Sequence, residues 1–257
     1  MKINIHAGHN PDGKVACGAV GLIKESTEAR ILKDKVINLL ESEGHTVYDC
    51  TINDGTNSSD VLKKIVKKCN SHDVDLDVSI HFNAGANDKQ GNNKTTGVEV
   101  LIYSTESKSY DAATRICSNI SKVGLKNRGV KINNSLYVLK HTNAPALLIE
   151  TCFVDDKDDI ELYKENINNV AKAIVKGILN EKYTKTEETT ESYKVKIMTE
   201  TLNVRAGAGT NYKVTTTVKK DEVYTIVDEK KNGSTIWLKL KSGAGWISQQ
   251  YTKKLGE

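Results

Sequence analysis

A stretch rich in threonine and glutamate, residues 183–193, divides the 257-residue chain into two parts of different composition. The stretch has no hydrophobic periodicity, which is typical of a linker. All five cysteines and both prolines precede it, whereas both tryptophans follow it. The last part carries 12 Lys+Arg against 6 Asp+Glu, and the first part carries 24 of each. The sequence therefore predicts two domains, residues 1–182 and 194–257, joined by a linker.

Short apolar runs alternate with helical patterns in the first domain. Runs typical of strands lie at residues 2–5, 46–49, 75–81, 98–103 and 146–150. Apolar residues recur at helical spacing between and after them, at residues 29–40, 61–69, 113–120 and 167–179. This alternation predicts an α/β fold with a mixed, mostly parallel sheet that helices flank on both faces. Functional sites in such folds lie at the carboxyl ends of the strands.

Histidine and glutamate stand where the predicted strands end and where the first helix begins. His9 follows the first strand, His81 ends the third, and Glu150 ends the fifth. Glu25 opens the first helical pattern. Zinc accepts both residue types, and a catalytic zinc keeps three protein ligands and one open position. A further carboxylate beside it would serve as general base.

Two of these positions have competitors in the sequence. His6 lies at the end of the first strand and competes with His9, and Glu28, one helical turn further on, competes with Glu25. A lone histidine also has a purely structural alternative, because it can cap a strand or lie satisfied in the core. The residue pattern alone leaves these alternatives open.

Cysteine catalysis is the alternative chemistry, because Cys17 and Cys152 lie near the predicted site. A nucleophilic cysteine needs electropositive surroundings and a histidine partner. Cys152 instead follows a buried strand and the acidic Glu150, which disfavours the thiolate. The five cysteines form no Cys-x-x-Cys pair, which argues against a disulfide scaffold or a cysteine-rich zinc module. We therefore expect them to pack as small apolar side chains.

Several short motifs follow one another in the first domain. They are His6-Ala7-Gly8-His9, Ser79-Ile80-His81-Phe82-Asn83-Ala84, Gly97-Val98-Glu99-Val100, Asn127-Arg128-Gly129-Val130, Leu136-Tyr137-Val138-Leu139 and Pro145-Ala146-Leu147-Leu148-Ile149-Glu150. In this order they resemble the zinc-dependent N-acetylmuramoyl-L-alanine amidases of the type-3 family, found in bacterial autolysins and phage endolysins. The resemblance covers residues 1 to about 180. It implies hydrolysis of the amide between N-acetylmuramic acid and L-alanine of the peptidoglycan stem peptide, with Zn²⁺ as cofactor.

The resemblance also implies roles for individual residues. His9, Glu25 and His81 fall on the zinc ligands, and Glu150 falls on the catalytic glutamate. Glu25 is preferred to Glu28 because the family's glutamate starts the helix. The long inhibitory helix of some cell-division amidases has no counterpart in this sequence.

Two further residues of these motifs are candidates for substrate binding. Asn83, two residues after a predicted ligand, would orient the substrate or hold its loop in place. Arg128 would bind a stem-peptide carboxylate, or else lie at a solvated sheet edge.

The second domain shows short segments with period-two alternation, separated by turns at residues 231–234 and 242–243. This spacing predicts a small all-β barrel. Its motifs Leu202-Asn203-Val204-Arg205, Trp237-Leu238-Lys239-Leu240 and Gly245-Trp246-Ile247-Ser248 resemble a bacterial SH3-type domain. The resemblance implies binding to the cell wall.

Tyr212 and Trp246 are the candidate cell-wall-binding residues of this barrel. Packing inside the barrel is the alternative for both tryptophans, and we favour it for Trp237. The excess of positive charge suits anionic wall polymers. Nucleic acid is not an expected partner, because no basic stripe interleaved with stacking aromatics occurs.

The whole chain resembles a phage endolysin that lyses Gram-positive cells. No apolar run approaches the ~18–20 residues of a membrane span, so membrane insertion is not expected. The first residues read as a strand without signal-peptide features, which predicts synthesis in the host cytoplasm and release through a holin pore. The alternatives are a host autolysin or spore-associated amidase, an endopeptidase on the same scaffold, and a wall-binding protein without activity. Met198, the one internal methionine, is a candidate start for a short C-terminal product.

Overall fold

The computed structural model describes residues 1–181, 192–233 and 235–255. The chain divides into two compact units, Met1–Lys185 and Thr186–Glu257. The predicted linker, residues 183–193, lies outside the described residues except for its last two, and Tyr193 already begins a strand. Within these described ranges, no helix is long and apolar enough to cross a membrane.

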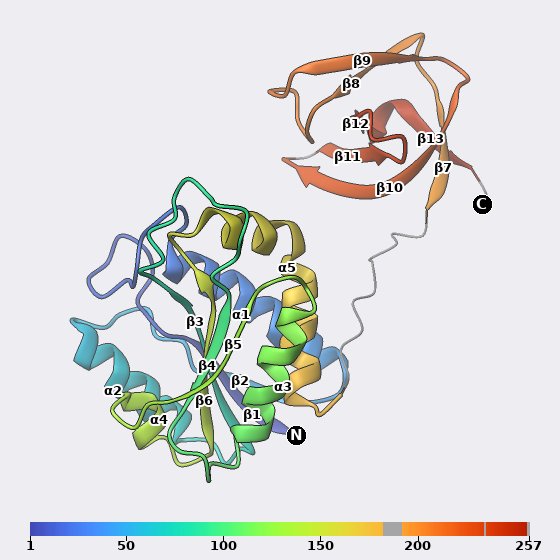
Figure 1. Ribbon diagram of the computed structural model, residues 1–257. Helices are drawn as coiled ribbons and strands as arrows, with labels where there is room; N and C mark the ends of the chain where they lie inside the picture. Colours follow the sequence, from blue (N-terminus) through green and yellow to red (C-terminus); the bar gives the residue numbers. More distant parts are fainter. Residues whose placement is uncertain (182–191, 234, 256–257) are drawn as a thin grey trace. The chain divides into compact units, whose positions relative to one another are not determined.

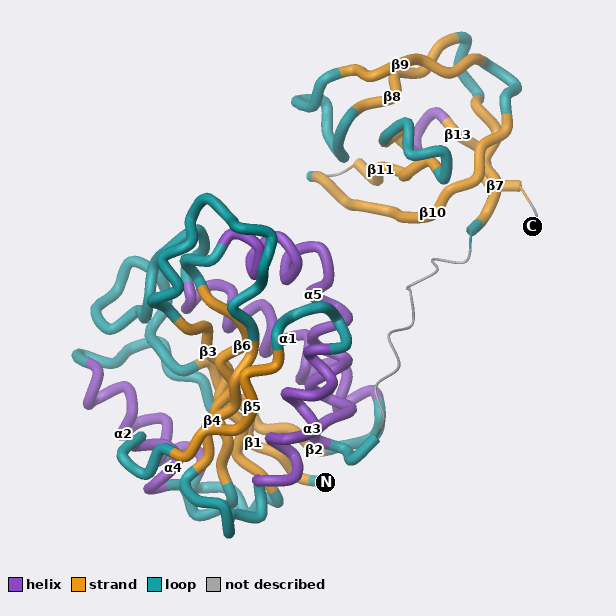
Figure 2. The backbone as a smooth tube through the Cα atoms, viewed as in Figure 1, coloured by secondary structure: helices purple, strands orange, loops and turns teal. Residues whose placement is uncertain are grey.

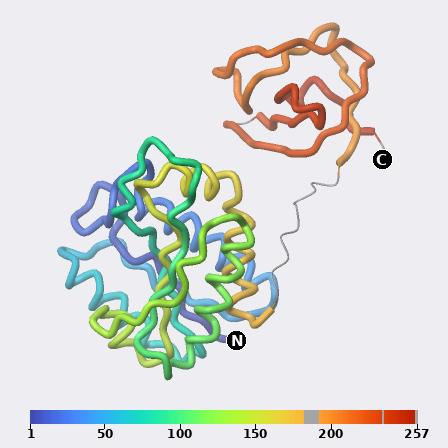
Figure 3. The backbone as a smooth tube through the Cα atoms, in the orientation of Figure 1, coloured from blue at the N-terminus to red at the C-terminus, as the bar shows by residue number. Residues whose placement is uncertain are grey.

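A six-stranded sheet forms the centre of the N-terminal unit (Figure 1). Its strands are β1 (Lys2–Ala7), β2 (Thr46–Asp49), β3 (Leu76–Asn83), β4 (Val98–Ile102), β5 (Asn127–Ile132) and β6 (Ala146–Phe153). The order is β2-β1-β3-β6-β4-β5, so β6 lies between two strands that precede it in the chain, as the colours of Figure 3 show. All neighbours run parallel except β4 and β6. The predicted α/β fold with a mixed, mostly parallel sheet is confirmed.

Helices cover both faces of this sheet (Figure 2). One face carries α1 (Glu25–Ser42), α3 (Tyr110–Ser121) and α5 (Lys157–Ile178), and the other carries α2 (Ser58–Cys69) and α4 (Tyr137–His141). The layer with α1, α3 and α5 encloses the larger apolar core. The layer with α2 and α4 encloses a smaller one.

The alternation of side chains along β3 explains why one face has room for a polar site. Successive side chains of a strand point to opposite faces. Val78, Ile80 and Phe82 belong to the larger core, so Ser79 and His81 point to the face of α2 and α4. His81 is close to the carboxyl end of β3, where the predicted site was expected.

Seven antiparallel strands form the C-terminal unit, in the order β13-β7-β10-β11-β12-β8-β9. They are β7 (Tyr193–Ile197), β8 (Thr201–Arg205), β9 (Val214–Lys219), β10 (Val223–Asn232), β11 (Thr235–Leu240), β12 (Trp246–Ser248) and β13 (Thr252–Leu255), and a short 3₁₀ turn, Gln249–Tyr251, precedes β13. Alternate residues such as Leu202 and Val204 fill the interior together with Leu238 and Ile247. The predicted all-β fold is confirmed.

Candidate metal centre

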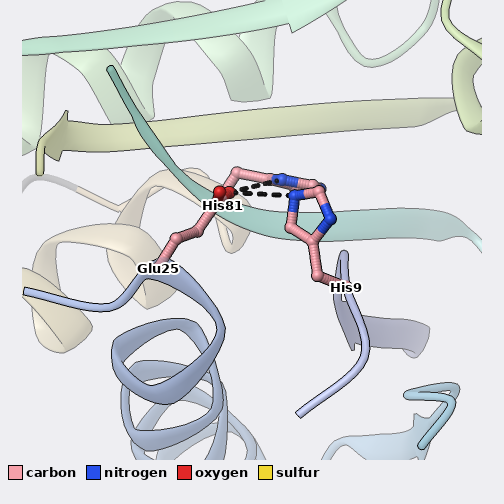
Figure 4. Close-up of side chains that lie close together, drawn as sticks. All are labelled: His9, Glu25 and His81. Atoms are coloured by element: carbon pink, nitrogen blue, oxygen red, sulfur yellow. Dashed lines mark hydrogen bonds and ion pairs between the residues drawn. The ribbon is translucent and has the colours of Figure 1, made fainter. Parts of the chain in front are cut away.

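Three side chains from separate elements meet at the carboxyl end of the sheet (Figure 4). His9 lies in the loop after β1, Glu25 is the first residue of α1, and His81 lies in β3. Glu25 Oε1 is 3.2 Å from His9 Nε2 and 2.9 Å from His81 Nδ1. The two imidazole rings stand edge to face, with centroids 4.9 Å apart. These side chains form a compact group of nitrogen and oxygen donors.

Backbone groups hold the Glu25 carboxylate in this position. The amide N–H of Phe82 donates to Glu25 Oε1 over 3.3 Å, and that of Ala19 donates to Oε2 over 2.7 Å. Glu25 is 4 % exposed and His81 is 9 % exposed. Charge-assisted bonds of this kind fix the direction of a carboxylate before any ligand arrives.

Two glycines make the close approach of these side chains possible. A Cβ at Gly8 would lie 1.8 Å from His81 Nε2, and a Cβ at Gly18 would lie 2.5 Å from Glu25 Oε2. Gly18 also has a φ of +79°, which side chains disfavour. Sequence reasoning missed both positions, because a glycine in a loop gives no local signal of the side chain that packs against it.

Burial and hydrogen bonding shift the acidity of this group in opposite directions. Burial opposes the charge of Glu25, but the hydrogen bonds from His81 and His9 outweigh it and hold the Glu25 pKa well below its usual range. Burial lowers the pKa of His81 although Glu25 stabilises its charged form. The site therefore presents an ionised carboxylate beside a neutral imidazole, which is the state in which both groups bind a cation.

The competing residues lie elsewhere. His6 is buried beneath the site, and its Nδ1 is 3.4 Å from Ser79 Oγ. Burial lowers the His6 pKa to about 3, with the nearby His81 adding to the effect. Glu28 accepts a hydrogen bond from the Tyr163 hydroxyl over 3.3 Å. Among the residues described, it is His9, Glu25 and His81 that form the His/Glu group able to hold a metal ion.

Glu150 stands next to this group. It pairs with His81 across β3 and β6, and with Glu99 across β6 and β4. Its Oε2 atom is buried and has no hydrogen-bond partner in the part of the chain that the structure describes. Burial, and then the charges of Glu25 and Glu99, raise the Glu150 pKa to about 8. A carboxyl with this environment is suited to accept and return a proton.

A pocket of about 550 Å³ opens over these residues. His9, Glu25, His81 and Glu150 form its polar side. The opposite wall is largely apolar and comes from α2 and the segment that leads into α4; its members include Val61, Leu62, Leu136 and Tyr137. A pocket with convergent polar groups on one side and apolar walls on the other is typical of a substrate site.

Glu99 links the two predicted substrate-binding residues. Asn83 Nδ2 donates to Glu99 Oε1 and Arg128 Nε donates to Glu99 Oε2, both over 2.8 Å. Arg128 also lies over the Phe153 ring, 4.9 Å from its centroid. Asn83 and Glu99 line the pocket. Glu99 was missed as a site residue, although a glutamate in an otherwise apolar strand was a usable signal.

The cysteines do not offer a nucleophile at this site. Cys152 is fully buried in the larger core, and burial, with Asp159 and other acids nearby, raises its pKa. Cys17 is half-buried, and all five cysteines are free thiols. The expectation that cysteines pack as apolar side chains fits the four that are buried.

The two predicted wall-binding residues lie at the surface of the C-terminal unit. Tyr212 is 44 % exposed and its ring packs on Gly207. Trp246 opens β12, with Lys239 Nζ 5.8 Å from its ring centroid. These two residues are not among those that line the cavity of about 370 Å³ found in the described part of this unit.

The donor set at the sheet end fits a zinc ion. Two imidazoles and one carboxylate are a ligand set found in catalytic zinc sites, where a fourth position stays open. Imidazole nitrogen and carboxylate oxygen are donors that suit a borderline metal ion such as zinc. Larger residues at Gly8 or Gly18 would collide with the side chains that supply these donors.

Comparison with known protein families divides the chain in the same way as the structure. Residues 3–180 match the N-acetylmuramoyl-L-alanine amidase family. Residues 200–253 match the bacterial SH3 domain. Each match falls within one compact unit.

Individual relatives share these domains. The endolysin of Bacillus phage SPP1 is 32 % identical over 269 residues, covering 93 % of this chain and 92 % of the relative. An uncharacterized protein of Clostridium perfringens is 36 % identical over 183 residues, 71 % of this chain. The chain spans about half the length of that protein and of a second one from the same species, 52 % and 53 %. The solved catalytic domain of the CD27L endolysin targeting Clostridia difficile is 32 % identical, with a TM-score of 0.64 over 72 % of this chain and 99 % of that one.

Proposed function

Because the chain belongs to the N-acetylmuramoyl-L-alanine amidase family, we propose that it hydrolyses the amide between N-acetylmuramic acid and the L-alanine of peptidoglycan stem peptides. The observation that carries the proposal is the meeting of His9, Glu25 and His81 beside Glu150 in one pocket. Each of these side chains reaches the pocket from a different element, so their convergence is a property of the fold.

Zn²⁺ is the proposed cofactor, held by His9, Glu25 and His81. When bound, zinc polarises a carbonyl oxygen and lowers the pKa of water toward ~7. The chain prepares this site through the amide N–H groups of Ala19 and Phe82, which orient the Glu25 carboxylate.

Glu150 is the proposed general base and acid. It takes a proton from the attacking water and delivers it to the alanine nitrogen as the amide bond breaks. In the metal-free chain its pKa is raised to about 8, and a base with a pKa near the working pH transfers protons efficiently in both directions. A bound cation would draw this pKa downward.

Asn83 and Arg128 are proposed to orient the stem peptide. Asn83 lines the pocket next to His81, and Glu99 holds both Asn83 and Arg128. Arg128 keeps guanidinium N–H groups beyond the one bonded to Glu99, and these would pair with a stem-peptide carboxylate. The apolar wall of α2 would keep bulk water away from the pocket while the one attacking water stays beside Glu150.

The cellular role that we propose is that of a phage endolysin acting on Gram-positive walls. The likeness to the SPP1 endolysin over almost the whole of both chains supports it. An enzyme with this role stays in the host cytoplasm until a holin pore releases it. A host autolysin or spore-associated amidase is the alternative, and expression from a phage lysis operon would separate the two.

The C-terminal domain is proposed to attach the enzyme to the cell wall. Its excess of Lys and Arg over Asp and Glu would attract anionic wall polymers. Tyr212 and Trp246 are the proposed contacts, and wall binding that weakens as salt rises would be the sign of the electrostatic part.

A separate C-terminal product starting at Met198 stays a prediction. Such a product would lack β7, which pairs with both β10 and β13. Val195 and Ile197 of β7 belong to the core of this unit. We therefore expect the product to fold only with a replacement for β7, and a single band on a denaturing gel would rule it out.

The test of the activity is mass spectrometry of fragments released from purified peptidoglycan. Stem peptides with a free L-alanine amino group, lost on chelation and restored by Zn²⁺, are the expected product. Cleavage inside the stem would indicate an endopeptidase instead. Release of no fragments, despite tight wall binding, would indicate a binding protein without activity.

A further inference from the structure

We propose that the C-terminal domain binds the glycan strand of the wall in a pocket around Trp237. The inference rests on the proposed attachment of this domain to peptidoglycan and names the part of the polymer that it holds. The pocket has a volume of about 370 Å³. It differs from the surface of Tyr212 and Trp246, which the sequence pointed to.

Trp237 is buried in this unit and also borders the pocket. It is 5 % exposed and counts among the buried apolar residues, as expected for packing inside the barrel. Its neighbours in the chain, Leu238 and Leu240, belong to the main apolar cluster. Leu202 and Tyr251 line the pocket together with Trp237. Tyr251 is 44 % exposed, so its ring is the one that offers an accessible apolar face to a ligand.

A buried hydroxyl beside Trp237 lacks a partner among the described residues. Ser248 pairs with Trp237 across β11 and β12 and lines the same pocket. The residue is 5 % exposed, and Ser248 Oγ makes no hydrogen bond to any residue that the structure describes. Leaving a buried hydroxyl unbonded costs free energy, and a ligand hydroxyl or amide would recover it.

The remaining walls carry neutral polar side chains. Thr201, Asn203, Thr235 and Gln250 line the pocket, and they offer hydroxyl and amide groups that both donate and accept. The one charged residue among the described lining residues is Arg205, and its Nη1 already donates to the carbonyl oxygens of Thr210 and Tyr212.

This chemistry favours an N-acetylated sugar over a stem peptide. Sugar rings present an apolar face to an aromatic ring and hydroxyls around their edge, which matches the exposed Tyr251 and the hydroxyl and amide groups that line the pocket with it. A stem peptide carries carboxylates, and the pocket meets them with a single arginine whose Nη1 is already bonded to two carbonyls. The glycan is also what the amidase reaction leaves in the wall, so binding it would keep the enzyme attached to wall that it has already cleaved.

The test is calorimetric titration of the full chain with a soluble tetramer of β-1,4-linked N-acetylglucosamine and, separately, with a free stem peptide. We expect saturable binding of the tetramer, weakened roughly 3- to 10-fold by Asn203→Ala and by Gln250→Ala, each of which removes about one hydrogen-bonding group. Asn211→Ala is the matched control, because Asn211 is exposed and does not line the pocket. Tryptophan emission should shift on binding in the natural chain and not in Trp237→Phe.

Three results would overturn this inference. They are binding of the stem peptide in place of the tetramer, loss of tetramer binding in Tyr212→Ala with no change in Asn203→Ala, and no binding of either probe. Because the tetramer has no lactyl amide, its binding is measured independently of hydrolysis. Failure of the proposed amidase activity would appear as intact peptidoglycan with tetramer binding retained.

Discussion

The pockets of the two units differ in the kind of polar group that they bury. The N-terminal pocket buries ionisable groups, with Glu25, His81 and Glu150 all shifted in pKa. The C-terminal pocket buries an aromatic ring and neutral hydroxyls, represented by Trp237 and Ser248. Perturbed ionisable groups mark chemistry, whereas an aromatic floor with neutral polar walls marks recognition.

The two pockets also differ in how the chain builds them. The N-terminal pocket collects residues that are far apart in the sequence, such as His9 and Glu150, and needs glycines for their close approach. The C-terminal pocket collects side chains from neighbouring antiparallel strands. The register of β11 and β12, for example, places Trp237 directly opposite Ser248. The following substitutions would break or sharpen this contrast.

The largest expected effect is the loss of catalysis in Glu150→Gln. Removing a general base lowers the rate roughly 10²- to 10⁴-fold, while the amide keeps the size of the side chain. Metal content and tetramer binding should stay unchanged. Release of stem peptides at the natural rate by this variant would contradict the role of Glu150 and the contrast between the two pockets.

The second effect concerns the close approach of Gly8 to His81 at the candidate metal centre. Gly8→Ala places a Cβ 1.8 Å from the His81 ring, so the ring must shift from the position in which it bonds Glu25. We expect zinc affinity to fall roughly 10- to 100-fold, as for other changes that misplace a ligand. Gly13→Ala is the control in the same loop, because its Cβ meets nothing within 4 Å; it adds only the backbone strain of a φ of +81°, which Gly8 does not have. Equal zinc affinity in both variants would show that zinc binding does not depend on the close approach of Gly8 to the His81 ring.

The third effect is the pH dependence of stability in the metal-free protein. Glu150 binds its proton more tightly in the folded chain, because its pKa rises from 4.5 to about 8. The folded chain therefore holds this proton between pH 4.5 and about 8 while the unfolded chain loses it, so the free energy of unfolding falls as pH rises through this range. Buried His6 and His81, with lowered pKa values, act in the opposite direction, but only below their unfolded value of 6.5.

Between pH 6.5 and 8 the effect of Glu150 is thus separated from that of the histidines. We expect the free energy of unfolding to fall by on the order of 2 kcal/mol over this interval. Glu150→Gln should remove the decrease, as chemical denaturation at several pH values would measure. A decrease of the same size in the variant would assign it to other groups.

The smallest effect concerns Glu99. Glu99→Gln removes the charge that faces Arg128 and Glu150, so it should cost about 1 kcal/mol of stability or less. It should also lower the Glu150 pKa and raise KM a few-fold through a less constrained Arg128. Glu106→Gln is the control, because Glu106 is an exposed acid whose carboxylate accepts from the Thr105 hydroxyl. If the pH dependence of the amidase rate is the same in Glu99→Gln as in the natural chain, Glu99 acts on Glu150 no more than Glu106 does.

Local patterns in the sequence were sufficient for most of the fold. Helical spacing and apolar runs indicated four long helices and five strands of the N-terminal unit, and period-two alternation indicated an all-β C-terminal unit. Two elements were missed. β5 (Asn127–Ile132) has polar residues in place of an apolar run, and α4 (Tyr137–His141) is too short to show helical periodicity. Tertiary packing stabilises both, and a single sequence does not display that.

The sequence by itself determined which residue types stand at the strand ends, and therefore the candidate chemistry of the site. The residue pattern left His6 open beside His9, and the tertiary structure shows that His9 meets Glu25, as the family resemblance implied. Only the tertiary structure decided that Glu99 joins Asn83 to Arg128 and that Trp237 borders a pocket. Periodicity reports the face of an element on which a side chain lies. The distance between side chains on different elements depends on strand order, register and the glycines that allow close approach, and these appear only when the chain is folded.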